Sequence, residues 1–223
     1  MDGATLLDIL GLTLKVGLVS TLALLVPGTA LGWLLARREF PGRTLLRVLV
    51  TLPMVLPPVA VGLLLLRLLS TRAASGRLAE SLLGGPVLLT WKAAALASAV
   101  MSLPLLVLGA EQAFAGVPRR LEHVAATLGA SRWRVFARVT LPLAARGLLH
   151  GSLFAFARSL GEFGATTVVA GNIPGRTETL ALGIYARIHQ FQDEQALLLA
   201  GVSLVLALAS TWAAEVWLRR RAR

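Results

Sequence analysis

The stretch LEHVAATLGASRWRVFARVTLP occupies residues 121–142 and separates two long apolar stretches of the chain. Leu121, Ala125 and Leu128 recur at the spacing of one helical face, whereas the charged side chains fall on other faces. The stretch is therefore basic and amphipathic. We interpret it as a structured element that a hydrophobic protein presents to a partner at the membrane surface.

Composition places the chain among membrane proteins. Hydrophobic residues make up 56% of the 223 positions and charged residues 15%, with a mean hydropathy of +0.75, whereas soluble domains carry about 25% charged residues. The lack of cysteine excludes disulfides, thiol nucleophiles and cysteine-based metal sites. The formal charge of +11 does not indicate nucleic-acid binding, because the positive residues stand in short loops between apolar runs.

The apolar runs are long enough to cross a bilayer. A helix that spans a hydrocarbon core about 30 Å thick needs roughly 20 apolar residues. The stretches that meet this length are about 9–36, 45–70, 88–113, 143–170 and 195–218. They lack the alternation of barrel strands. The sequence predicts an all-α integral membrane protein with about five transmembrane helices, in a single domain over residues 1–223.

The positive charges predict the orientation of these helices. An odd number of spans puts the termini on opposite sides, and the side richer in Lys and Arg faces the cytoplasm. Most of the arginines fall after the first span, in the loop of about 115–142 and in the C-terminal tail. We therefore expect the N-terminus outside and the C-terminus inside. The segment 179–190 is too short to cross, and we expect an interfacial or re-entrant helix on the outer face.

The loop of about 115–142 contains start and stop signals for two short helices. Pro118 suits the first turn of a helix. Gly129 can take the left-handed conformation that ends one helix, and Ser131 can cap the next. We expect two short helices joined by a tight turn that faces the cytosol. Physics alone leaves open an ordinary interfacial connector, whose arginines meet anionic lipid headgroups.

The same loop resembles the EAA loop of bacterial ABC-importer permeases, through which the membrane subunit contacts its ATPase. In the pattern E-A-A-x3-G-x9-I-x-L-P, Gly129, Leu141 and Pro142 keep the family spacing, and Val139 replaces Ile. The start departs from the pattern, because His123 stands at the first position and Glu122 lies one place earlier. The resemblance assigns ATPase coupling to Glu122, His123, Ala125, Leu128, Gly129, Ala130, Ser131, Arg132, Trp133, Val139, Leu141 and Pro142.

Further segments are similar to the molybdate permeases of this family, so that the resemblance covers nearly the whole chain. They are residues 40–42 (FPG), 52–59 (LPMVLPPV), 156–166 (FARSLGEFGAT) and 172–175 (NIPG). The resemblance implies a type I ABC importer permease in the cytoplasmic (inner) membrane, with several passes. Sulfate/thiosulfate or tungstate is the alternative substrate within the family.

The resemblance also implies the partners of the chain. They are a second copy forming a homodimer with the pathway at its interface, two ATP-binding subunits on the cytoplasmic side, an extracytoplasmic oxyanion-binding protein and membrane lipid. ATP and Mg would be bound by the partner ATPase, so no cofactor is expected in this chain.

The predicted fourth span carries ionisable residues. Arg158 and Glu162 lie four residues apart, and we expect them on one helical face near mid-span, where charged groups are costly and face protein or water. Three interpretations stay open: a structural pair, direct binding of an oxyanion by Arg158, or a gate or dimer contact. The Pro57-Pro58 pair should kink the second span, either to shape a pathway or for packing. The pathway or gate candidates are Pro57, Pro58, Arg158, Ser159, Glu162, Gly164, Thr166 and Thr167.

The sequence offers no catalytic or metal-binding motif. It lacks the Gly-x4-Gly-Lys-Ser/Thr phosphate loop, His-Glu-x2-His and Gly-x-Ser-x-Gly, and its three histidines are scattered. We therefore expect a transport subunit rather than an enzyme. A membrane enzyme, or a scaffold with a basic surface loop, is the rival from another class.

Overall fold

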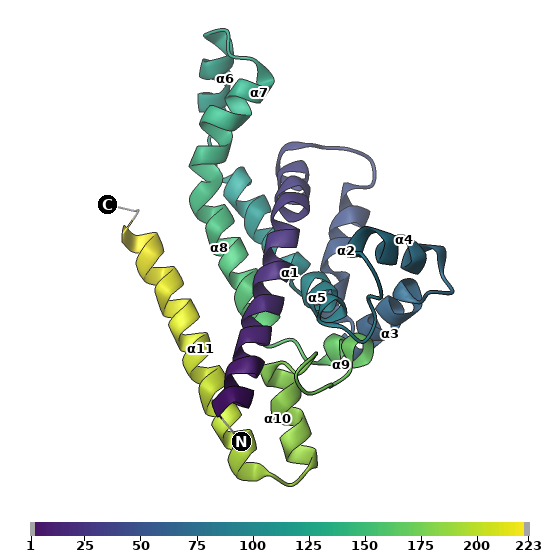
Figure 1. Ribbon diagram of the computed structural model, residues 1–223. Coiled ribbons are helices and arrows are strands. Elements are labelled where there is room, and N and C mark those ends of the chain that lie inside the picture. The colour runs from purple at the N-terminus through teal and green to yellow at the C-terminus, as the bar shows by residue number, and fades with distance from the viewer. Residues whose placement is uncertain (1–2, 221–223) are drawn as a thin grey trace.

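The computed structural model describes residues 3–220, and these residues form a helical bundle (Figure 1). The elements are α1 (Gly3–Arg37), α2 (Arg43–Val55), α3 (Pro58–Leu69), α4 (Ala74–Leu83), α5 (Trp91–Ala115), α6 (Arg119–Thr127), α7 (Arg132–Val135), the π-helical turn η1 (Phe136–Thr140), α8 (Leu141–Leu160), α9 (Gly164–Ala170), α10 (Leu180–His189) and α11 (Asp193–Arg220).

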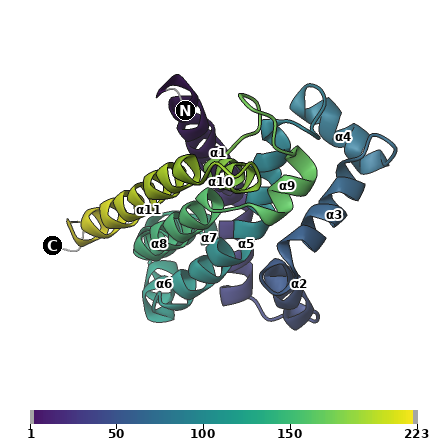
Figure 2. The same ribbon diagram turned by 90° about the horizontal axis from the view of Figure 1, so that it is seen from below.

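Helix α5 is the centre of the bundle and packs mainly against α1 and α8. Of the membrane-span candidates it is the most buried, with 67% of its apolar window inside the protein, against 11% for α11. Seen from below, α2–α4 lie on one side of this centre and α11 on the other (Figure 2). The apolar faces of the outer helices are thus left to face lipid or another subunit.

Small residues set the spacing of the central helices. A Cβ on Gly109 of α5 would lie 2.7 Å from the Cα of Gly151 on α8, and a Cβ on Gly32 of α1 would lie 2.4 Å from that of Ala110. Lipid tails are as apolar as the side chains, so helix association in a bilayer depends on close packing of this kind. The backbones of α1, α5 and α8 can approach one another because these positions carry almost no side chain.

Three predicted spans correspond to single helices, namely α1, α5 and α11. The second is a bent pair, because α2 and α3 meet at 113°. Leu56 and Pro57 both adopt extended backbone angles, as expected for residues that precede prolines. The kink predicted at Pro57-Pro58 is confirmed, and it is sharp enough that the described residues contain four candidate spans, or five if the bent pair counts as one.

The prediction of one continuous span over 143–170 was wrong. Helix α8 ends at Leu160, and α9 starts again at Gly164. At the break, the Glu162 carboxylate accepts a hydrogen bond of 2.9 Å from the Ala165 N–H and so satisfies a free donor in the first turn of α9. The composition of 143–170 stays apolar across this break, so hydropathy does not reveal it.

Helix α8 begins at Leu141, close to the predicted start of the span at about residue 143, but this point is not the start of the helical run. Helix α7 continues through η1 into α8 as one apolar helical rod from Arg132 to Leu160. Pro142 has no N–H for a bond four residues back, and the widened turn before it accommodates the proline, since Leu141 N–H bonds to the Phe136 carbonyl. The second short helix of the loop is therefore the end of a long rod.

The segment predicted as a short outer helix forms α10, which lies at the opposite end of the molecule from α6 and α7 (Figure 1). Its first residue is tied to α1, because Leu180 N–H donates to Thr13 Oγ1 at 2.8 Å. A buried ion pair between Glu178 and Arg187 fixes the chain just before it. The end of the bundle that carries α10 is thus fixed by a hydrogen bond to α1 and by an ion pair.

Replacing Gly109 by leucine should destabilise the bundle, because the new side chain meets the α8 backbone at Gly151. Overpacking of a close contact costs about 1–3 kcal/mol. The apparent melting temperature of the purified chain in detergent should fall clearly for Gly109→Leu. It should stay near the wild-type value for Gly201→Leu in α11, where a Cβ meets nothing within 4 Å. Equal melting of the two variants would refute the packing role of this contact.

Candidate coupling surface and translocation path

The turn between α6 and α7 has the geometry that the sequence predicts. Gly129 adopts a φ of +83°, in the left-handed region that glycine takes most readily. Ser131 Oγ accepts a hydrogen bond of 3.4 Å from the Arg134 N–H and caps α7. Both helices extend beyond the bundle at the end of the α8 rod (Figure 1). The prediction of two short helices joined by a tight turn is confirmed, except that α7 does not end separately.

The rod is longer than the hydrocarbon core of a bilayer is thick. The helical run from Arg132 to Leu160 has 29 residues, and at about 1.5 Å per residue it exceeds a core of about 30 Å by more than two turns. An interfacial connector would lie flat at the layer boundary. This loop instead projects from the bundle at the end of a long helix (Figure 1).

The projecting surface carries exposed apolar side chains. No residue of α6 is buried. Leu128 is 82% exposed and Trp133 is 74% exposed, and Leu121 and Val124 are also exposed. A cluster of large apolar side chains in contact with water indicates a surface that another protein covers. We call Leu121, Val124, Leu128 and Trp133 the coupling surface.

A network of polar contacts fastens α6 to the bundle. Glu122 forms an ion pair of 3.1 Å with Arg37 at the end of α1, and it accepts a hydrogen bond of 2.6 Å from Thr140 Oγ1 in η1. Arg37 also donates to the Val117 carbonyl at 2.9 Å. Glu122, whose sequence position departs from the EAA pattern, is thus the residue that joins α6, α1 and the rod.

An aromatic cluster supports the same junction. The ring of Phe136 lies 5.7 Å from Trp133, 5.9 Å from Trp33 and 6.3 Å from Phe114, measured between ring centroids. Trp33 belongs to α1 and Phe114 to α5. Phe136 thus joins the base of the coupling surface to α1 and α5, where packed rings resist local bending.

The predicted coupling residues fall into separate groups. Leu128 and Trp133 are on the coupling surface, and Gly129 and Ser131 form the turn. Glu122, His123, Ala130 and Arg132 line a cavity behind the surface. Val139, Leu141 and Pro142 lie in the rod, where Leu141 packs against the cluster that contains Phe114 and Ala144. Sequence reasoning did not identify Arg37, Thr140 or Phe136, whose partners are far away in the chain.

The second region is the ion pair of Arg158 and Glu162, whose atoms lie 2.8 Å apart. The two residues are not on one helical face near mid-span, since α8 ends between them. The Glu162 side chain is 1% exposed and holds both Arg158 and the first turn of α9. Of the three interpretations, this geometry supports the structural pair.

Arg158 also faces a cavity at the α2–α3 bend. Its side chain is 33% exposed and lines a space of about 170 Å³, whose other walls include Pro53, Pro58 and Met101. Apolar walls around one partly neutralised cation suit weak, reversible contact with an anion. This cavity is the candidate part of a translocation path within one subunit.

Other candidate residues of the translocation path lie where the break between α2 and α3 meets the break between α8 and α9. A Cβ on Gly164 would lie 2.6 Å from the Cβ of Pro58, so α9 begins directly against the start of α3. Ser159 and Thr167 donate to backbone carbonyls one turn earlier. Thr166 is buried, and its hydroxyl has no hydrogen-bond partner among the described residues. Pro57 caps α3 and does not line the Arg158 cavity.

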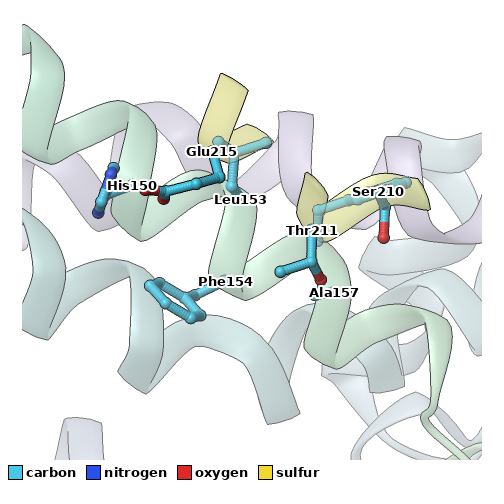
Figure 3. A pocket seen from close by; sticks show the side chains of 8 residues that line it. His150, Leu153, Phe154, Ala157, Ser210, Thr211 and Glu215 are labelled. Atoms are coloured by element: carbon cyan, nitrogen blue, oxygen red, sulfur yellow. The ribbon is translucent and has the colours of Figure 1, made fainter. Parts of the chain in front are cut away.

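A smaller cavity of about 70 Å³ lies between α8 and α11. Figure 3 shows the Glu215 carboxylate directed toward His150, with Phe154 and Thr211 below them in the view. This volume holds a few water molecules at most, since a water takes roughly 30 Å³ in the liquid. We assign it to helix packing rather than to a path.

Comparison with known proteins identifies the family. Residues 28–223 match the family described as the inner membrane component of binding-protein-dependent transport systems. The chain belongs to this family. It is accordingly a multi-pass protein of the inner membrane, as predicted.

Relatives are similar along most of the chain. The molybdenum transport system permease protein ModB of Escherichia coli (strain K12) is 45% identical over 95% of this chain and 93% of that protein. The ModB protein of Haemophilus influenzae is 40% identical with the same coverage. The sulfate transport system permease protein CysT of Escherichia coli (strain K12) is 39% identical over 81% of this chain and 65% of that protein.

A solved structure shares the fold. A chain of the inward-facing MetNI methionine ABC transporter superimposes with a TM-score of 0.75, covering 100% of both chains at 17% sequence identity. The predicted architecture, an all-α permease of the type I ABC importer class, is confirmed by this match together with the family assignment.

Replacing Glu122 by glutamine should loosen α6, because it removes a charged partner from the largely buried Arg37 side chain. Hydrogen bonds to charged groups contribute about 1.5–3 kcal/mol. Amide hydrogen exchange over residues 119–127 should become faster in Glu122→Gln. The matched control is Glu39→Gln, an exposed acid at the same end of the bundle. Unchanged protection of α6 in Glu122→Gln would contradict the anchoring role.

Proposed function

We propose that this chain is the permease subunit of an ABC importer that translocates molybdate or a similar tetrahedral oxyanion. The observation that carries this proposal is the similarity to molybdenum permeases, which extends over nearly the whole of both chains. The sulfate permease CysT is similar over less of its own length. Sulfate is therefore the second candidate substrate.

The proposed assembly is a homodimer with its path at the subunit interface, two ATP-binding subunits on the cytoplasmic side and an extracytoplasmic oxyanion-binding protein. The coupling surface supports the ATPase contact, because its exposed apolar side chains project from the bundle on α6 and α7. ATP binding would bring the ATPase subunits together, and the two coupling surfaces would move with them. The bundle would then open outward through the α1, α5 and α8 contacts.

Arg158 supplies the electrostatic element of the path. Its charge is partly neutralised by Glu162, and the rest of its cavity is apolar. An oxyanion entering there would be attracted weakly and released readily, as conduction requires. In this proposal the binding protein determines most of the specificity.

Substrate identity is tested by uptake into proteoliposomes that contain the chain with its ATPase and binding protein. Labelled molybdate should accumulate only with ATP, tungstate should compete, and an equal concentration of sulfate should compete poorly. Sulfate and molybdate have the same charge but differ in size, so discrimination depends on the fit of the binding protein. Equal competition by sulfate, or uptake of labelled sulfate in preference to molybdate, would favour the second candidate.

The coupling role is tested by Trp133→Ala, which removes the largest side chain of the coupling surface. Truncating an interface tryptophan commonly costs 2 kcal/mol or more, roughly a 30-fold loss of affinity. ATP-dependent uptake and co-purification of the ATPase should both fall, while the amount of permease in the membrane stays the same. Trp212→Ala is the matched control, since Trp212 is 71% exposed but lies in α11. Normal uptake in Trp133→Ala would rule out this surface as the ATPase contact.

A further inference from the structure

Behind the coupling surface lies a cavity of about 540 Å³ that the proposed function does not use. Its walls come from the end of α1, from α6 and α7, and from η1. Among its lining residues, four arginines face a single glutamate. The arginines are Arg37, Arg38, Arg119 and Arg132.

The positive charge of this cavity is not balanced by the protein. Glu122 is engaged by Arg37 and Thr140. Within residues 3–220, no carboxylate lies within ion-pair distance of Arg38, Arg119 or Arg132. Arg38 is held over the ring of Trp33, with its guanidinium carbon 5.7 Å from the ring centroid. Like charges gathered around one space favour the entry of an anion.

Arg37 provides an independent sign of a missing ligand. Its side chain is 9% exposed, and its buried Nε–H has no hydrogen-bond partner among the described residues. A buried donor left without a partner costs about 1–3 kcal/mol. The arginine that joins α1 to α6 therefore keeps one donor unsatisfied at the wall of a basic cavity.

We propose that this cavity binds one tetrahedral oxyanion of the phosphate type. Guanidinium groups present paired N–H donors that match the oxygens of such an anion. The group could be the headgroup phosphate of an anionic phospholipid of the cytoplasmic leaflet, or a free inorganic oxyanion of the cytosol. The phosphate chemistry is the same for both sources. The cavity also has an apolar wall, formed by Trp33, Val135 and Phe136.

The bound anion would connect two parts of the coupling machinery. Arg37 is the last residue of α1 and Arg38 follows it, whereas Arg119 and Arg132 belong to the projecting helices α6 and α7. An anion held between them would stiffen the attachment of α6 and α7 to the end of α1. The proposal does not depend on the substrate of the transporter, because the cavity is at the opposite end of α8 from the Arg158 cavity.

The test uses the full-length chain, purified in zwitterionic detergent and depleted of lipid. One arm adds phosphatidylglycerol, or phosphatidylcholine as the uncharged comparison, and counts retained lipids by native mass spectrometry. The other arm measures binding of labelled inorganic phosphate by equilibrium dialysis at constant ionic strength.

The test variant is Arg119→Gln/Arg132→Gln, which removes two cavity charges. The matched control is Arg120→Gln/Arg134→Gln, which makes the same changes in the same two helices at positions that are exposed, like Arg119 and Arg132, but do not line the cavity. Ala126→Glu is a second test variant, since it places a carboxylate at the cavity wall without removing an arginine. Melting temperatures near that of the wild type show that each variant is folded.

The expected result is at least about a tenfold loss of anion binding in both test variants, in keeping with the loss of charge-assisted bonds, and wild-type binding in the control. Loss confined to phosphatidylglycerol identifies the headgroup as the source, and loss confined to phosphate identifies the free ion. The proposal is overturned if neither anion binds the wild-type chain, or if the control loses as much as the test variants. It is also overturned if the variants impair only association with the ATPase, which would assign the cavity to acidic side chains of that partner.

Discussion

A single unbroken helical rod from Arg132 to Leu160 is the constraint on which the rest of the structure depends. Its backbone hydrogen bonds continue through the widened turn before Pro142, where the Leu141 N–H bonds to the Phe136 carbonyl. One of its ends carries the coupling surface, and the other ends beside Arg158 and the break before α9. In the proposed coupling, a force applied to Trp133 at one end would be transmitted along this helix to the candidate path at the other.

Both helix breaks occur where the chain satisfies or lacks the backbone groups that a break sets free. Irregular backbone in a membrane survives only where protein satisfies its polar groups. The break after Leu160 is satisfied by the buried Glu162 carboxylate, and the break at Pro57 needs fewer bonds because prolines have no N–H. The two breaks meet where Gly164 packs on Pro58. Discontinuous helices of this kind are where transporters commonly place their substrate sites.

Much of this architecture could be predicted from sequence, because lipid imposes a simple length rule on apolar helices. The turn at Gly129 and the kink at Pro57 followed from backbone restrictions that belong to single residues. The break after Leu160 could not be predicted, because it depends on a side chain that caps the next helix inside an apolar run. The pairing of Glu122 with Arg37 was missed for another reason: one sequence contains no signal for a contact between residues so far apart.

The charged residues near α6 and α7 fall into two groups: those in ion pairs, and arginines without a carboxylate partner among the described residues. Glu111 and Glu122 are both engaged with arginines of the α1–α2 region, and these contacts hold neighbouring helices together. Arg38, Arg119 and Arg132 are left without such partners among the described residues, in a cavity that they share. The positive-inside rule requires an excess of Lys and Arg at this end but does not specify where each residue lies. Their place in one cavity with the buried Arg37 comes from the fold, which brings the end of α1 against α6 and α7, and it is this local excess of charge that the proposed anion would neutralise.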